Sequence, residues 1–388
     1  MRRSGHRTGA EATSRGDPAR QPGRRRPRLG ARAGRLDESA DGDRDRRACA
    51  PARARRGPRL EGGGRLMSTV GKPLTAGVDL GGTKIQTVVL RDEEIVASAR
   101  VLTPQTGDAG DVIEAIAGTI RTSLGDAGAN GDLRGIGIGT PGSIDADSGV
   151  VSLAANVPGF ADHVELGPRV SQAMDGTKVT IDNDVRVGIL GEYRRGAGRP
   201  FKNVLGVWVG TGVGGGLILD GELHDGRGAA GEIGHLIVKP GGRPCGCGRR
   251  GCLEAYAGRA RMELRARQLH KQGHKTILFK IMEKSGRQRL SSGVYARALA
   301  KGDRMTQRLI DEATWALGIA LASAQNLLDL EAIIVGGGLG DRLGQPFVDR
   351  VVEQMTPHLF VPDKPPLVLR TELGDLSGAV GAAVLAGG

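Results

Sequence analysis

The alternation of apolar and polar residues divides the chain into a long polar start and a regularly patterned remainder. From residue 74 onward, apolar runs of strand length alternate with longer segments in which apolar residues recur at helical spacing. The first three runs are joined by a Gly-Gly turn and an Asp-Glu turn, which predicts antiparallel strands. This first series consists of predicted strands at 74–80, 84–90, 93–101, 135–139 and 177–181, and of predicted helices at 108–125 and 182–195.

The same succession begins again after residue 195. The second series has predicted strands at 204–210, 214–221, 232–238, 332–335 and 366–372, and predicted helices at 259–272, 305–328, 341–357 and from Ser377. Two successive series of a β-hairpin followed by βα units predict a duplicated α/β domain with a cleft between the halves. We place the halves at 67–182 and 183–388. The polar helical stretch 262–300 is interpreted as an inserted lobe in the second half.

The first 66 residues lack this patterning. They contain no Val, Ile, Phe, Tyr or Trp, so they cannot bury enough apolar surface to offset the ordering of their backbone. They also carry nearly all of the net charge of +12, which leaves the body nearly neutral. One interpretation is an Arg-rich nucleic-acid arm, but neither aromatic residues nor helical periodicity accompany the arginines. We predict a disordered extension that binds no nucleic acid, with Met67 as the candidate true start.

Composition excludes other classes of protein. No apolar run reaches the ~18 residues of a membrane span, and the N-terminus lacks the apolar core of a signal peptide. Three of the four cysteines lie within 245–252, while Cys49 lies in the extension without an evident partner. This distribution argues against a secreted disulfide scaffold and predicts a reducing compartment, hence a cytoplasmic protein without membrane contact.

Three glycine-rich loops each follow a predicted strand, where backbone N–H groups can approach a phosphate closely. Two other glycine patterns, at Gly137 and Gly210, match the dinucleotide fingerprint, but neither opens the helix that this fingerprint requires. Three loops in order favour a nucleotide site. The candidate nucleotide-binding residues are Gly81, Gly82, Thr83 and Lys84 in the first loop, Thr211, Gly212, Gly214 and Gly215 in the second, and Gly337 and Gly338 in the third.

Asp79 would sit at the end of the first strand, just before the first glycine loop. A carboxylate at such a position can hold a hydrated Mg²⁺ ion beside the phosphates of a nucleotide. We therefore predict that Asp79 is a magnesium ligand.

A cluster of metal-binding residue types is the most specific feature of the sequence. His235, Cys245, Cys247 and Cys252 lie on one short segment, and three thiolates with one imidazole suit tetrahedral Zn²⁺. Because the protein would fill all four positions, the metal would be structural and would not activate water. The alternative is three reduced cysteines beside an unrelated histidine.

Carboxylates flank this cluster and the predicted start of the helix near residue 182. Glu232 and Glu254 bracket the zinc loop, and carboxylates with Asn amides are suited to sugar hydroxyls. In the Asp182-Asn183-Asp184 run, we predict Asp184 as general base and Asp182 as a helix cap only. The helix N-terminus is expected to keep the pKa of Asp184 low. If Glu232 and Glu254 are considered by themselves, the alternative interpretation is that they are exposed surface charges without a binding role.

The sequence over 67–388 resembles the ROK family of sugar kinases and transcriptional repressors. The resemblance rests on GVDLGGTK, GIGTPGSID, IDND, GTGVGGG, EIGH, CGCGRRGCLEAYA and VGGGLG, which occur in the family's order. It implies an actin/hexokinase-like fold of two RNase-H-like domains and a catalytic base at Asp184. It also implies sugar contacts from Ser143, Asn156, Asn183, Asp184, Glu232, His235 and Glu254. His235 would then serve both zinc and sugar.

The resemblance implies an ATP-dependent kinase that phosphorylates a hexose hydroxyl, with glucose to glucose 6-phosphate as the first expectation. An N-acetyl-hexosamine or fructose kinase, and a sugar-sensing regulator, remain alternatives. The extension lacks the apolar periodicity of the helix-turn-helix that repressors in this family carry, and the retained Asp184 fits a catalyst. ATP and Mg²⁺, a structural Zn²⁺ and a homodimeric or homotetrameric assembly complete the expectation.

Overall fold

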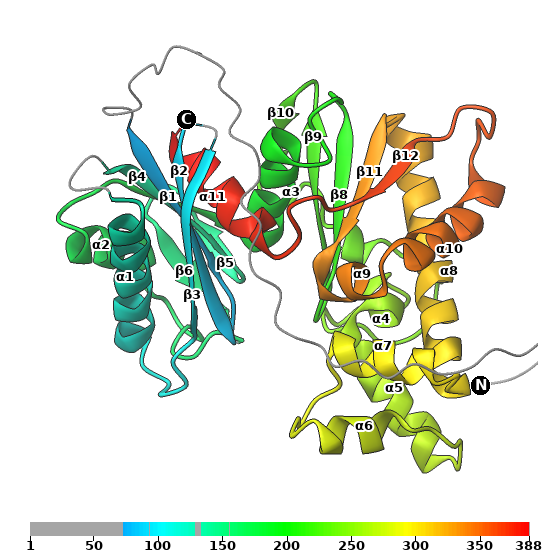
Figure 1. The fold of residues 1–388 in the computed structure, drawn as a ribbon. Helices are drawn as coiled ribbons and strands as arrows, with labels where there is room; N and C mark the ends of the chain where they lie inside the picture. Colours follow the sequence, from blue (N-terminus) through cyan, green and yellow to red (C-terminus); the bar gives the residue numbers. More distant parts are fainter. Residues whose placement is uncertain (1–72, 93, 129–132, 155, 388) are drawn as a thin grey trace, which may run out of the picture. The chain divides into compact units, whose positions relative to one another are not determined.

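The computed structural model describes residues 73–92, 94–128, 133–154 and 156–387. The expectations for the Arg-rich extension, including Met67 and Cys49, lie outside these residues. Within them, no helix combines the length and the apolar character needed to cross a membrane. The described elements form two mixed sheets with helices packed against them (Figure 1).

The first sheet has the strand order β3-β2-β1-β4-β7. Its strands are β1 (Leu74–Leu80), β2 (Lys84–Arg91), β3 (Glu94–Leu102), β4 (Leu133–Thr140) and β7 (Val179–Asn183). Strands β1, β2 and β3 pair antiparallel, whereas β1, β4 and β7 run parallel. Asp79 pairs with Gly139, and Gly139 pairs with Asp182, so the carboxyl ends of three strands meet at one edge.

Helices and a short hairpin complete this half. Asp108 caps helix α1 (Ala109–Asp126) through a 2.7 Å hydrogen bond from the backbone N–H of Gly110. Helix α2 (Leu166–Ala173) precedes β7, and β5 (Ser143–Asp145) pairs with β6 (Val150–Ser152). Helices α1 and α2 pack on each other and bury an apolar cluster with the sheet.

The second sheet repeats the same arrangement, with the order β10-β9-β8-β11-β12. Its strands are β8 (Val204–Val209), β9 (Val213–Leu219), β10 (Glu222–Leu223), β11 (Ala332–Gly336) and β12 (Leu367–Arg370). Strands β8, β9 and β10 pair antiparallel, and β8, β11 and β12 run parallel. Because both sheets place two antiparallel strands beside three parallel ones, the predicted duplication is confirmed.

The helices of the second half build one large core around Tyr295, Phe347 and the apolar face of the longest helix. They are α4 (Glu254–Ala257), α5 (Arg259–Lys271), α6 (Leu278–Lys284), α7 (Ser292–Ala300), α8 (Arg304–Leu328), α9 (Gly337–Leu343) and α10 (Gln345–Met355), with the short 3₁₀ turns η1 (Ile233–His235), η2 (Thr356–His358) and η3 (Gly374–Leu376). Most of the predicted insert at 262–300 is therefore helical, as expected.

The last helix, α11 (Ser377–Gly387), packs against α3 (Asp184–Arg195) and against β1 and β4 of the first sheet. A Cβ placed on Gly137 of β4 would lie only 1.8 Å from the carbonyl oxygen of Ala382. Glycine at this position therefore permits the close approach of helix and strand. Although α11 follows the second half in sequence, it packs on the sheet of the first half.

Two expected elements differ in the structure. The strand expected at 232–238 is instead η1 followed by extended chain, and the third strand of the second sheet is the two-residue β10. The helix expected at 341–357 is two helices, because Gly344 has a φ of 68° and ends α9 before α10 begins. Glycine adopts a positive φ at little steric cost because it has no Cβ, and Pro346 lies in the first turn of α10.

A buried carboxylate joins α3 to the segment before α11. Glu192 accepts hydrogen bonds from the backbone N–H groups of Ala197, Glu372 and Leu373 and from the Ser377 hydroxyl, at 2.6–3.1 Å. Glu192 is fully buried, with 0 % of its surface exposed. Four donors therefore satisfy a charge that would otherwise be costly to bury.

We expect Glu192→Gln to lower the free energy of unfolding by roughly 2–4 kcal/mol, because an amide NH₂ would face donors that need an acceptor. Chemical denaturation followed by circular dichroism measures this change. Glu353→Gln, at an exposed position on α10, is the matched control and should change stability by less than about 0.5 kcal/mol. Equal effects of the two substitutions would contradict this role for Glu192.

Candidate functional site

Two carboxylates lie at the edge where the parallel strands of the first sheet end. Asp79 is the penultimate residue of β1, and Asp184 is the first residue of α3, directly after β7. A Cβ on Gly139, which pairs with Asp79 and Asp182 in the sheet, would be 3.4 Å from the Cα of Asp184. This edge is where open α/β sheets bind their ligands.

Burial controls the ionisation of both groups. It raises the pKa of Asp79 to about 6, and the charge of Asp184 adds to this rise. Burial also raises the pKa of Asp184, although the Val185 N–H donates a 2.9 Å hydrogen bond to its carboxylate. The expectation that the helix N-terminus holds the pKa of Asp184 low is therefore wrong, because desolvation outweighs the helix. A raised pKa brings a carboxylate nearer to the range useful for a general base.

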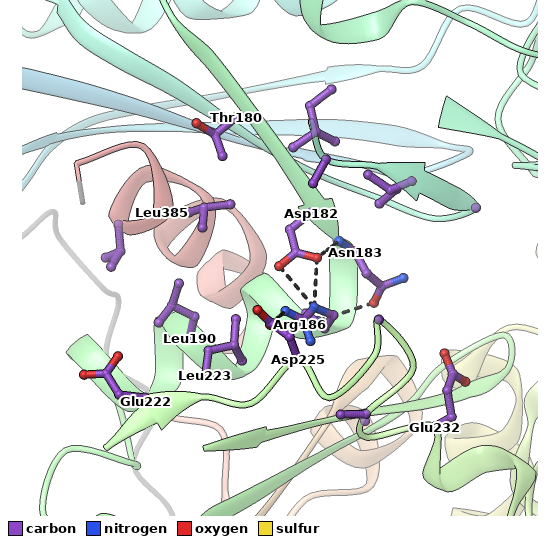
Figure 2. A pocket seen from close by; sticks show the side chains of 18 of the residues that line it. Thr180, Asp182, Asn183, Arg186, Leu190, Glu222, Leu223, Asp225, Glu232 and Leu385 are labelled. Carbon is purple, nitrogen blue, oxygen red and sulfur yellow. Dashed lines mark hydrogen bonds and ion pairs between the residues drawn. The ribbon is translucent and has the colours of Figure 1, made fainter. Parts of the chain in front are cut away.

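The structure also corrects the role of Asp182. The cap of α3 is Asn183, whose side-chain oxygen accepts hydrogen bonds from the N–H groups of Val185 and Arg186 at 3.0 and 3.4 Å. Asp182 instead accepts a 2.8 Å hydrogen bond from Nε of Arg186 in a largely buried ion pair. Figure 2 shows the Asn183 amide nitrogen directed away from the helix while its oxygen faces α3. The amide nitrogen is therefore left to donate to a ligand.

A pocket of about 780 Å³ opens beside these residues (Figure 2). Ser143, Asn183 and Glu232, all predicted sugar contacts, line it. Arg186 also lines it and forms an ion pair with Asp225, which connects α3 to the segment after β10. The volume suits a small-molecule ligand. The polar residues that line this pocket can donate to and accept from hydroxyl groups.

The four predicted zinc ligands converge. One ligand atom from each of His235, Cys245, Cys247 and Cys252 lies within 4.8 Å of every other. Sulfurs bound about 2.3 Å from one tetrahedral Zn²⁺ would be about 3.8 Å apart, and the Cys247 and Cys252 sulfurs are 3.7 Å apart. Cys245 and Cys252 are buried, whereas Cys247 is exposed. The donor set and its spacing therefore fit a closed zinc site.

His235 faces both the cluster and the predicted sugar contacts. Its Nδ1 lies 3.9 Å from the Cys245 sulfur, and its Nε2 lies 3.9 Å from the Glu232 carboxylate. The ring can therefore give Nδ1 to a metal and keep Nε2–H for a carboxylate or a hydroxyl. Glu254 lies on the other side, with one carboxylate oxygen 3.6 Å from the Cys245 sulfur.

Glu254, which borders the zinc loop, contacts the second glycine loop. The N–H of Val213 donates a 3.1 Å hydrogen bond to Glu254, and a Cβ on Gly212 would lie 2.3 Å from the same carboxylate oxygen. In the first loop, a Cβ on Gly82 would lie 1.9 Å from the carbonyl oxygen of Asn156. Both glycines thus bring a loop close to a predicted sugar contact.

The predicted nucleotide residues are distributed over several places. Thr83 and Thr211 line a second pocket of about 480 Å³, and Gly338 lines a third of about 1010 Å³. Lys84 lies 3.4 Å from Asp375 in an ion pair.

The other predicted nucleotide residues lie in strands, turns and a helix start. Gly214 and Gly215 lie within β9, and Gly337 begins α9. Gly81 is held in its turn by the Thr103 hydroxyl, which donates to its carbonyl oxygen at 2.6 Å.

Arg259 lines both the second and the third pocket. Its guanidinium donates to the hydroxyls of Thr211 and Ser292 at 2.9 and 3.0 Å. It does not belong to any of the glycine motifs, so motif reasoning misses it. The available signal is a cation at the first residue of a predicted helix, where acidic residues are preferred.

The match to a family model covers nearly all of the described chain. The model of the ROK family matches residues 75–388. The chain belongs to the ROK family. Curated relatives include the glucokinase of Thermotoga maritima, 34% identical over 316 residues, which are 79% of this chain and 95% of the relative. An N-acetyl-D-glucosamine kinase of Photobacterium profundum is 33% identical over 324 residues, which are 80% of this chain and 98% of that kinase.

Solved structures of ROK proteins show the same fold. A ROK family glucokinase from Streptomyces griseus, in complex with glucose and AMPPNP, is 33% identical with a TM-score of 0.68. The alignment covers 81% of this chain and 99% of that structure. A ROK hexokinase from Thermus thermophilus is 32% identical with a TM-score of 0.67, over 81% and 97% of the two chains. The expected actin/hexokinase-like architecture is therefore confirmed for this ROK protein.

The raised pKa values of the partly buried Asp79 and Asp184 predict a gain in stability when one of these carboxylates is neutralised. A carboxyl whose pKa is raised in the fold destabilises the fold at a pH above that pKa, and the cost disappears as the pH falls. The cost builds up between the unfolded-state pKa of 3.8 and the folded-state pKa of about 6. We therefore expect Asp79→Asn to raise the melting temperature at pH 7.5, without added Mg²⁺, and to raise it clearly less at pH 4.5. Thermal scans of both proteins at the two pH values measure this. A lower melting temperature at pH 7.5 would contradict it.

Proposed function

We propose that this ROK protein is an ATP-dependent hexokinase that converts glucose to glucose 6-phosphate. The observation that carries the proposal is the retained Asp184 beside the pocket lined by Asn183 and Glu232, in a chain one third identical to a glucokinase bound to glucose and AMPPNP. The carboxylate and amide groups supply the acceptors and donors that a sugar needs.

In the proposed reaction, the pocket orients the sugar so that one hydroxyl faces Asp184. The carboxylate accepts the hydroxyl proton while the oxygen attacks the terminal phosphorus of ATP, and the departing group is ADP. The glycine loops bring backbone N–H groups to the phosphates. Asp79 would hold Mg²⁺, which supplies charge neutralisation of the phosphates when bound.

The zinc loop has a positioning role in this proposal. Glu232, His235 and Glu254 all border it, so a metal held by His235 and the three cysteines fixes three proposed sugar contacts at once. The zinc is structural, because four protein ligands leave no position for a water.

A kinetic comparison of sugars tests the assignment. We expect glucose to give the highest kcat/KM with ATP, and N-acetylglucosamine, fructose and mannose to be at least ~10-fold lower. ADP formation in a coupled assay measures each value. N-acetylglucosamine is the second candidate because relatives of that activity are 30–33% identical. A higher kcat/KM for N-acetylglucosamine than for glucose would move the proposal to that substrate.

The location, the assembly and the partners of the protein are also matters of proposal. We infer a cytoplasmic homodimer or homotetramer that binds no nucleic acid. Light scattering after gel filtration tests the assembly. A DNA-binding assay on the full chain tests the regulator alternative, and salt-sensitive binding would favour it.

A further inference from the structure

We propose that Arg259 binds the phosphate chain of the phosphoryl donor and that this contact, more than the glycine loops alone, gives the donor its affinity. The inference rests on the proposed kinase function and adds a donor-binding residue to it. The shared chemistry is a linear phosphoanhydride chain, which a nucleoside triphosphate or an inorganic polyphosphate can supply.

The position of Arg259 is the first argument. Its backbone N–H donates to the carbonyl oxygen of Gly210, and the N–H of Ala260 donates to that of Thr211, which fixes the start of α5 against the second glycine loop. A Cβ on Gly338 would lie 3.6 Å from Nη1 of Arg259. Thr83 lines the same pocket as Arg259. One guanidinium therefore adjoins the second and third glycine loops and lines a pocket together with the first.

The second argument is the cost of placing a cation there. Burial lowers the pKa of Arg259, which means that the surroundings disfavour its charged form. It is also the first residue of a 13-residue helix, where the helix dipole repels a cation. Within 73–92, 94–128, 133–154 and 156–387, no carboxylate forms an ion pair with it, and its side-chain partners there are two neutral hydroxyls. A bound anion would offset these costs.

The third argument is the contrast with the neighbouring arginines. Glu263 accepts from Arg289 and Arg267 at 3.1 and 2.7 Å and from the Leu290 N–H at 3.0 Å, so it pairs with Arg289 and anchors the segment 289–290. Arg287, two residues away, lines both pockets beside Arg259. Arg289 therefore holds this segment in place, whereas Arg287 lines the two pockets.

The shape of the site favours a chain of phosphates over a single phosphate. The second and third pockets share Arg259, Arg287 and Ser291, and Arg297 and Arg342 line the third. Arginines thus line both the pocket that contains Thr83 and Thr211 and the pocket that contains Gly338. They outnumber the carboxylates there, which are Glu263 in the second pocket and Asp341 and Asp375 in the third. Guanidinium groups match phosphate oxygens in a bidentate manner.

Calorimetric titration of the full chain tests the proposal with binding as the readout. We expect Arg259→Gln to weaken the binding of Mg-AMPPNP at least ~10-fold and that of glucose less than twofold. The loss should grow from AMP to ADP to AMPPNP, because a phosphate contact acts more strongly on a longer chain. Arg259→Lys should recover part of the affinity through its charge. Arg308→Gln is the matched control, because this arginine of α8 pairs with Glu312 at 3.2 Å and lines neither pocket; it should bind AMPPNP within twofold of the original protein.

The outcomes separate this inference from the proposed function. Inorganic tripolyphosphate and a longer polyphosphate, each titrated alone and tested as donor, distinguish the two sources of the chain. Binding of either that depends on Arg259, without AMPPNP binding, would support the inference and replace ATP as donor. An equal loss for AMP and AMPPNP, or unchanged AMPPNP binding in Arg259→Gln while the original protein phosphorylates glucose, would overturn it. Binding of neither nucleotide nor polyphosphate by the original protein would overturn both.

Discussion

Asp184→Asn is expected to lower kcat by at least ~100-fold, because a positioned general base contributes about 10²–10⁴-fold to such a reaction. The amide keeps the shape of the side chain but cannot accept the proton of the sugar hydroxyl. The affinity for nucleotide should remain nearly unchanged, because Thr83, Thr211 and Gly338 border other pockets. Steady-state kinetics with ATP and glucose measure both quantities.

Asp182→Asn is the control for Asp184→Asn, and in the structure it tests an ion pair and not a helix cap. Asp182 pairs with Arg186 and does not cap α3, so Asp182→Asn removes part of a largely buried ion pair. We expect it to lower the melting temperature while kcat falls less than tenfold. If Asp182→Asn abolished turnover and Asp184→Asn did not, the assignment of the base would be reversed. If neither changed kcat, the proposed mechanism would be wrong.

Loss of zinc is expected to be the second large effect. Purified protein should contain about one Zn²⁺ per chain, and Cys247→Ser should remove most of it. The melting temperature and the affinity for glucose should fall together, because the cluster holds His235 near Glu232 and Glu254. Metal analysis, thermal scans and glucose titration give the three quantities on the same sample.

Zinc-stripped original protein is the matched comparison for Cys247→Ser. Removal of the metal should reproduce the loss of glucose affinity, and added Zn²⁺ should restore it only where Cys247 is present. A protein with no zinc whose three clustered cysteines all titrate freely in the native state would contradict the site. A zinc-free protein with unchanged glucose affinity would contradict the positioning role.

The regular parts of the fold could be predicted from sequence because their patterns are local. The Gly-Gly and Asp-Glu turns between short apolar runs predict β1, β2 and β3, and the structure has them within one or two residues. The repeat of that succession predicts the second sheet. The zinc cluster was also predictable, since four metal-binding residues fall on one short segment, and their side chains converge in the structure.

The remaining features depend on contacts between distant residues. Apolar periodicity near 232–238 suggests a strand, but the backbone turns there, where His235 meets the cysteines. The Asp182-Asn183-Asp184 run identifies a helix start, but only the approach of Arg186 shows which residue caps it. The pKa of Asp184 depends on burial, which a local pattern does not contain. Arg259 stands out only in the structure, where it lines pockets together with Thr83, Thr211 and Gly338 of the three glycine loops.

Identification of the product tests the central claim most directly. Phosphorus NMR of a mixture of the protein, Mg-ATP and glucose should show ATP converted to ADP and one new phosphomonoester, split by the two protons of glucose carbon 6. Asp184→Asn should give almost none of this signal in the same time. ATP consumption without a sugar phosphate, or no reaction with any hexose tested, would contradict the account.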